Sequence, residues 1–202
     1  MNDSMLKSLV VNCRSIRSFD ESRPVSRDDL LEFIDTARLC ASAANRQPLK
    51  YRTATGSECK GIQPLTAWAG ALPDLELPPK GHMPTGFILI CHDTNISPAS
   101  DYAAMDVGIA AQTIALAAAE RGVGCCMIGS FDKAGVAREL EIPDHLIPRL
   151  LMAFGYPAES AVICTAKNGK TSYFRDDTGL HFVPKRDLSE VVIPQKADKN
   201  VL

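Results

Sequence analysis

Residues 106–131 read "DVGIAAQTIALAAAERGVGCCMIGSF", and this stretch decides the fold. The segment 103–119 is apolar nearly all round, which is typical of a helix at the buried centre of a protein. It is shorter than the roughly 20 residues that a bilayer requires, and Asp106 and Gln112 interrupt it. Its alanines would let a neighbouring backbone approach closely, so we expect a central helix and consider it for a subunit contact. The apolar run 125–130 follows as a buried strand.

Outward from this stretch, helices and strands interleave, but the strands are few. That pattern predicts an α+β protein with one modest sheet and not a doubly wound fold. Ser26 followed by Asp29 resembles a capping box and begins a helix that ends near Cys40. The other predicted elements are a helix from Asp3 or Ser4 to about Asn12, strands at 51–55, 86–91 and 148–157, and a helix from Asp132 to about Leu140.

The whole chain, 1–202, is predicted to be a single domain with two looser parts. Residues 56–85 contain five prolines and four glycines, and we interpret them as a lid or excursion. Residues 187–202 form an extended C-terminal tail.

Composition excludes several classes of protein. The net charge of −2 gives no general electrostatic reason to bind nucleic acid or a membrane surface. The seven cysteines have no C-x-x-C spacing, and the first residues lack a signal peptide, so we expect reduced thiols in a cytoplasm. The four histidines are scattered, and we predict no metal site.

Four short segments carry side chains suited to a ligand. "CRSIRSF" (13–19) offers two arginines and a serine just past a helix, which suits either a solvated turn or a phosphate or heterocycle site. "ASAANRQP" (41–48) removes side-chain bulk beside two amides, which suits either a tight turn or a flat ring. "MIGSF" (127–131) places a glycine at a strand end, and "VPKRDL" (183–188) holds a late basic pair.

Taken in order, these segments resemble the nitroreductase family of FMN flavoproteins. "CRSIRSF" resembles the family's R-R-S-x-R-x-F, and "ASAANRQP" resembles its A-P-S-x-x-N-x-Q-P-W. The stretch 106–131 resembles its central helix and following strand, and "AFGYPAE" (153–159) and "VPKRDLSEVV" (183–192) resemble its C-terminal signature. The resemblance covers nearly the whole chain. It implies an α/β/α sandwich with a central mixed sheet, and a homodimer with FMN in each of two clefts at the subunit interface.

The resemblance also implies which residues hold FMN. Arg14, Ser15 and Arg17 would contact the phosphate, the ribityl chain and the pyrimidine edge, with Arg17 near N1 and O2. Ser42, Ala43 and Asn45 of the partner chain would contact the ring system, with Gln47 close by. The backbone of Ile128, Gly129 and Ser130 would line the flavin, and Lys185 or Arg186 would complete the phosphate site.

The implied activity is that of an FMN-dependent oxidoreductase. It would use NADH or NADPH to reduce nitroaromatics, quinones or similar electron-poor compounds by ping-pong hydride transfer through flavin N5. No catalytic side chain is needed, and a fixed cation at Arg17 would stabilise the reduced ring. Two alternatives stay open: another reaction on the same fold, such as reductive dehalogenation or flavin breakdown by oxygen, and a non-catalytic FMN sensor or reservoir.

Three positions depart from the family pattern. Cys13 stands where the family has its first arginine, Ala41 where it has proline, and Leu49 where it has tryptophan. No flavin contact can be aligned onto residues 56–85, a region that usually shapes the substrate pocket in the family.

Overall fold

The computed structural model describes residues 4–70, 72 and 74–194. The chain divides into two compact units, Met1–Ser160 and Ala161–Leu202, and each is described by itself. Whether they act as one domain stays a prediction.

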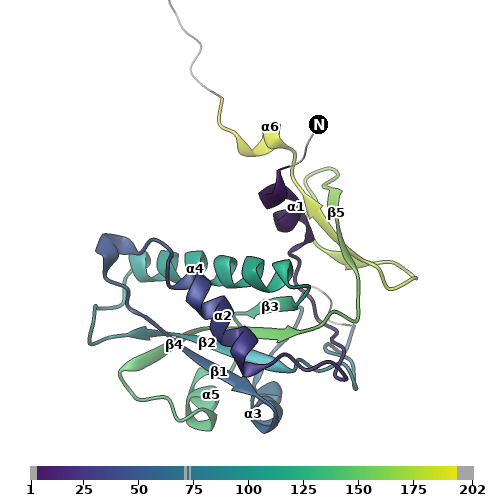
Figure 1. Ribbon diagram of the computed structural model, residues 1–202. Coiled ribbons are helices and arrows are strands. Elements are labelled where there is room, and N and C mark those ends of the chain that lie inside the picture. Colours follow the sequence, from purple (N-terminus) through teal and green to yellow (C-terminus); the bar gives the residue numbers. More distant parts are fainter. Residues whose placement is uncertain (1–3, 71, 73, 195–202) are drawn as a thin grey trace, which may run out of the picture. The chain divides into compact units, whose positions relative to one another are not determined.

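A four-stranded sheet forms the centre of the first unit, in the order β1-β2-β4-β3 (Figure 1). Its strands are β1 (Leu49–Thr55), β2 (Gly86–Asp93), β3 (Gly124–Ile128) and β4 (Leu146–Gly155), and neighbours pair antiparallel. A single parallel bridge joins Ser15 to Cys125 at the β3 edge, which makes the pairing mixed there. Every residue of β2 is buried, because the strand is covered on both faces and presents alternate side chains to each.

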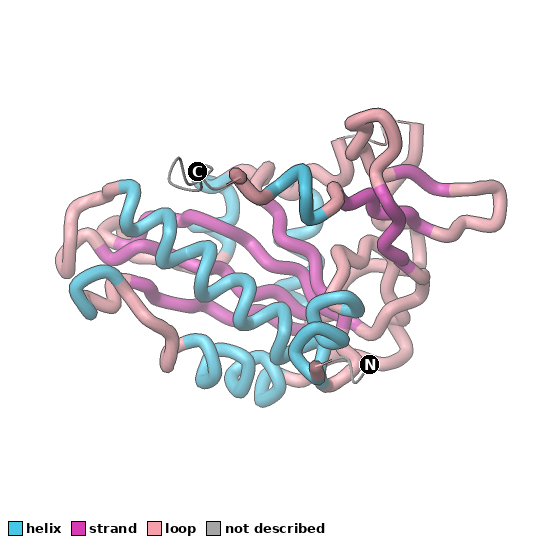
Figure 2. Tube along the Cα trace, turned by 90° about the horizontal axis from the view of Figure 1, so that it is seen from above, coloured by secondary structure: helices cyan, strands magenta, loops and turns pink. Residues whose placement is uncertain are grey.

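Helices α2 (Arg27–Ala37) and α4 (Asp101–Glu120) cover one face of this sheet and run alongside each other across the strands (Figure 2). The core on this side joins Leu30 and Phe33 of α2 and Ile114 of α4 to Ile88 and Ile90 of β2. The predicted central helix is confirmed. Within the described residues α4 alone is long and apolar enough to cross a membrane, yet one side of it, including most of its alanines, is buried on the sheet.

Helices α3 (Ser57–Ile62) and α5 (Lys133–Glu139) cover the opposite face, which completes three layers (Figure 1). Asp132 caps α5 as predicted, accepting a hydrogen bond of 3.0 Å from the Gly135 N–H. The interpretation of residues 56–85 as a lid or excursion stays a prediction, and the segment begins with helix α3. Cys59 and Ile62 of α3 are buried in the core, and a short 3-10 turn, η2 (Gln63–Leu65), continues from it.

Helix α1 (Met5–Asn12) has Ser4 as its N-cap, one of the two predicted caps. The other, Asp3, lies outside the described residues. No residue of α1 is buried, and Met5 and Leu6 are strongly exposed.

The second unit holds a small three-stranded sheet in the order β5-β7-β6. Strand β7 (His181–Lys185) pairs parallel with β5 (Ala161–Thr165) and antiparallel with β6 (Phe174–Arg175). The rings of Phe174 and Phe182 stack across the pair, with centroids 5.0 Å apart. The short helix α6 (Leu188–Val191) follows, and residues 195–202 of the predicted tail lie outside the described part.

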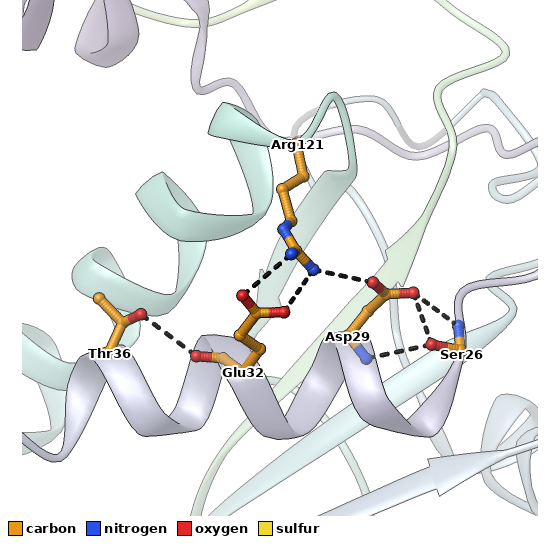
Figure 3. Close-up of polar contacts among 5 residues, drawn as sticks. All are labelled: Ser26, Asp29, Glu32, Thr36 and Arg121. Atoms are coloured by element: carbon orange, nitrogen blue, oxygen red, sulfur yellow. Dashed lines mark hydrogen bonds and ion pairs between the residues drawn. The ribbon is translucent and has the colours of Figure 1, made fainter.

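The capping box at the start of α2 is confirmed and belongs to a polar cluster that ties α2 to the end of α4 (Figure 3). Ser26 Oγ donates to Asp29 Oδ2 at 2.6 Å, and the Asp29 N–H donates back to Ser26 Oγ at 3.1 Å. Arg121 reaches both Asp29 Oδ1 at 3.0 Å and Glu32 Oε2 at 2.6 Å. The carboxylate of Asp29 therefore serves a cap and an ion pair at once.

We expect Asp29→Ala to destabilise the protein more than Arg121→Ala. The exposed ion pairs of Arg121 contribute about 0–1 kcal/mol. Asp29→Ala removes one of these pairs and also the acceptor of the hydrogen bonds from the Ser26 N–H and Ser26 Oγ, which contribute about 0.5–1.5 kcal/mol each. Urea unfolding of both variants measures the difference, with Glu32→Ala as the control that removes an ion pair and spares the cap. Equal losses in Asp29→Ala and Glu32→Ala would contradict this division of roles.

The same carboxylate predicts a pH dependence. The hydrogen bond from Ser26 is the largest cause that lowers the pKa of Asp29, and Arg121 adds to it. A carboxyl with a lowered folded-state pKa stabilises the protein above its unfolded-state pKa and loses that effect as pH falls through the folded-state value. The native protein and Asp29→Ala should therefore differ less in their free energy of unfolding in acid than at neutral pH, which urea unfolding at both pH values measures.

Candidate functional site

The loop after α2 has an unusual backbone between Ser42 and Gln47. It forms the 3-10 turn η1 (Ala43–Asn45), in which Ala44 has φ 51°. Asn45 and Gln47 also have φ 51°, so three non-glycine residues adopt the left-handed region within four positions. Asparagine tolerates this conformation, but alanine and glutamine do not favour it. Strain of this kind persists only where surrounding contacts impose it, and it gathers at functional sites.

Asp106 of α4 imposes this conformation. Its side chain is 6% exposed. Its carboxylate accepts 2.7 Å from Ser42 Oγ and 3.0 Å from the Ala43 N–H. Ser42 Oγ in turn accepts 3.0 Å from the Gln47 N–H, which closes the loop on itself. The loop is thus anchored by one buried carboxylate, while Asn45 and Gln47 remain exposed at its tip.

Hollows lie on two sides of Asp106. One, of about 470 Å³, opens between the loop and the start of α4, with Ala43, Arg46 and Tyr102 in its wall. The other, of about 210 Å³, reaches toward β1 and includes Tyr51. Burial, followed by the charges of Cys40 and Asp106, raises the pKa of Tyr51 to about 12, so this phenol stays protonated at neutral pH.

The segment after α1 lies along the edge of β3. The Ile16 N–H donates 2.9 Å to the Cys125 carbonyl, beside the Ser15 bridge. Ser15 is exposed, and Arg14 Nη2 donates 2.6 Å to the Val10 carbonyl. Arg14 Nε is buried and has no hydrogen-bond partner among the described residues. An unsatisfied guanidinium N–H beside an exposed hydroxyl fits an anionic group such as a phosphate.

Arg17, two residues further on, is 8% exposed. Its backbone N–H donates to Glu159 Oε1. Burial raises the pKa of the neighbouring Cys126 thiol to about 11, and the positive charge of Arg17 opposes that rise. A buried cation therefore lies beside β3, close to the predicted flavin-lining residues.

The strand end at 128–130 is brought close to a part of the chain that the sequence did not assign to the site. Ile128 is buried, Gly129 and Ser130 are exposed, and the surroundings of Gly129 are open. The Ala67 N–H donates 2.9 Å to the Ser130 carbonyl. Next to it, Trp68 donates 2.7 Å to Thr66 Oγ1 and packs edge-on against Phe19. The one available signal for Trp68 was that it is the chain's single tryptophan, placed in a proline-rich segment.

The predicted site residues thus fall into three groups. Arg14, Ser15 and Arg17 lie along the β3 edge. Ile128 ends that strand, and Gly129 and Ser130 follow directly after it. The loop 42–47 is anchored on α4, and neither hollow around Asp106 is lined by Arg14 or Arg17. Lys185 and Arg186 belong to the second unit, where Arg186 Nη1 contacts Glu190 Oε2 at 3.3 Å. Their part in a phosphate site stays a prediction.

Comparison with known proteins shows the family of this chain. The model of the nitroreductase family matches residues 10–156, and the chain belongs to that family. An FMN reductase (NADPH) of Bacillus subtilis is 31% identical in an alignment 175 residues long, which covers 74% of this chain and 64% of that protein. Another B. subtilis relative, an FMN reductase named for NAD(P)H, is 27% identical in an alignment 179 residues long, which covers 79% of this chain and 68% of that one.

A solved structure confirms the predicted fold. A Desulfovibrio desulfuricans protein, described as a nitroreductase in complex with FMN, superposes with a TM-score of 0.70 at 19% identity. The match covers 96% of this chain and 99% of that one. The α+β, nitroreductase-like sandwich is therefore the fold of this chain.

Proposed function

We propose that this protein reduces nitroaromatic, quinone or similar electron-poor compounds in a ping-pong reaction, and that it does so as a homodimer. Family membership carries the coarser statement that it is an NAD(P)H-dependent FMN oxidoreductase. The observation that carries the proposal is the strained loop 42–47. Asp106 anchors this loop by two hydrogen bonds, and the side-chain amides of Asn45 and Gln47 are exposed at its tip. A loop with that geometry suits delivery to the site of a second chain.

The residues present fit FMN. Arg14 and Ser15 would hold the phosphate and ribityl chain, and Ile128, Gly129 and Ser130 would lie along the ring with their backbone. When bound, FMN supplies the hydride transfer between nicotinamide and acceptor. Arg17 provides a fixed, partly desolvated cation that favours negative charge beside it. In this proposal Arg14, Ser15 and Arg17 act by binding and by charge, and none of them serves as an acid or base.

The ping-pong part of the proposal has a direct kinetic test. Initial rates are measured with NADPH or NADH varied at several fixed concentrations of a quinone. Because donor and acceptor occupy one site in turn, double-reciprocal plots should be parallel. Lines that intersect to the left of the vertical axis would contradict this order and indicate that both substrates are bound to the enzyme at the same time.

We expect a stable dimer that buries more than the ~1,600 Å² of a standard interface. The outer face of α4 is apolar and exposed at Tyr102, Met105 and Ile109, and α1, which contacts α4, buries no residue. Both features fit a surface that a second chain covers. Sedimentation at micromolar concentration measures the mass, and a folded, flavin-loaded monomer would rule the dimer out.

We also place the protein in the cytoplasm, because its seven cysteines are free thiols.

A further inference from the structure

The backbone brings Cys13 near Cys125. The Cys13 N–H donates 2.9 Å to the Leu9 carbonyl, which fixes it at the end of α1. Two residues later Ser15 pairs with Cys125, and the Ile16 N–H bonds the Cys125 carbonyl at 2.9 Å. The Cys13 side chain packs on the buried cluster that includes Cys125. Cys126 faces the other core, because side chains alternate along a strand.

The two thiols differ in charge state. Contact with the Cys125 thiol lowers the pKa of Cys13 to about 7, with Arg14 and Gln112 adding to that effect. The same contact, together with burial, raises the pKa of Cys125. Cys13 therefore favours the thiolate more than an ordinary cysteine does and is partly exposed, whereas Cys125 is a buried thiol. Thiolate character and access are what make a cysteine reactive, and a neighbouring thiol can resolve its oxidised form.

The other buried cysteines form a contrast. Burial raises the pKa of Cys59 to about 11 and that of Cys91 to about 12. Those thiols remain protonated and enclosed, as structural cysteines do. Reactivity toward an oxidant is therefore expected at Cys13 before either of them.

We propose that Cys13 and Cys125 form a peroxide-reactive pair that closes to a disulfide between the end of α1 and strand β3. The Cys13 thiolate attacks one oxygen of hydrogen peroxide, the O–O bond breaks, and the departing hydroxide takes a proton to become water. The resulting sulfenic acid is attacked by the sulfur of Cys125, which forms the S–S bond and releases a second water. Two thiols lose two electrons in total, and the peroxide accepts both. The proposal is independent of the flavin reaction.

The disulfide is tested by mass spectrometry on the reduced, purified full-length chain. The protein is treated with one equivalent of hydrogen peroxide, the remaining thiols are alkylated with iodoacetamide, and the chain is digested with trypsin without reduction. The expected product links peptide 8–14 to peptide 122–133, with the loss of two hydrogens. Because the second peptide also contains Cys126, the digest is repeated on Cys126→Ser, which should form the same link.

Reaction rates provide a second readout that does not depend on disulfide yield. Alkylation of Cys13 should reach half its maximal rate near pH 7, and Cys125→Ala should move that midpoint upward. In Cys125→Ala the oxidised Cys13 should instead be trapped as a sulfenic acid by dimedone. The proposal is overturned if peroxide leaves Cys13 fully alkylatable, if the link joins other cysteines, or if the Cys13 midpoint is unmoved by Cys125→Ala.

Discussion

Arg17→Ala should lower the midpoint potential of bound FMN by roughly 20–65 mV and slow hydride uptake from NADH or NADPH. The cation at the predicted pyrimidine edge favours the reduced, anionic ring over the neutral oxidised one. For a two-electron couple 30 mV corresponds to about 1.4 kcal/mol, and loss of such a charged contact costs about 1–3 kcal/mol. Redox titration of fully loaded protein measures the shift, and oxidised FMN should be lost only in part.

Two matched variants separate this effect from a general disturbance. Arg17→Lys keeps the charge and should recover most of the potential. Arg186→Ala should weaken FMN binding with the potential nearly unchanged, because a phosphate contact does not respond to the redox state of the ring. An unchanged potential in loaded Arg17→Ala would remove Arg17 from the pyrimidine edge.

Asp106→Ala should reduce FMN affinity by about tenfold or more, even though Asp106 is not predicted to touch the flavin. Its buried carboxylate accepts two hydrogen bonds that hold the strained loop, and each hydrogen bond to a charged group contributes about 1.5–3 kcal/mol. Without them Ala44 and Gln47 are expected to relax from the left-handed region, and the loop loses the geometry that presents Asn45. Fluorescence titration of the apoprotein with FMN measures the loss.

Asp101→Asn is the matched control, since it removes an exposed carboxylate from the first turn of the same helix. It should bind FMN as the native protein does. Circular dichroism checks that α4 is intact in both variants. If Asp106→Ala binds FMN normally while remaining folded, the anchored loop has no part in the flavin site.

Local signals in the sequence were sufficient for most of the fold. The apolar run at 86–91, the capping box at Ser26 and the alanine-rich stretch each fix an element through contacts between near neighbours. Helix α3 was missed, because the prolines and glycines around it dominate the pattern of 56–85 while two buried side chains hold it in the core.

The site depended on contacts that no local pattern encodes. In the sequence Asp106 only interrupts an apolar helix, because its partners Ser42 and Ala43 lie more than sixty positions away. The pairing of Ser15 with Cys125, which places Arg17 beside β3 and Cys13 near a second thiol, joins residues still further apart in sequence. The roles of the arginines came from family resemblance, since two arginines near a helix end are by themselves compatible with a solvated turn.

The central claim, a flavin reduced by a nicotinamide, is tested most directly by the visible spectrum of the purified protein. Oxygen is removed, and NADH or NADPH is added to protein carrying or reconstituted with FMN. The account predicts a yellow protein whose flavin band bleaches within the time of turnover and returns when a quinone is added. A protein that cannot be loaded with FMN, or whose flavin bleaches with dithionite but with neither nicotinamide, would contradict it.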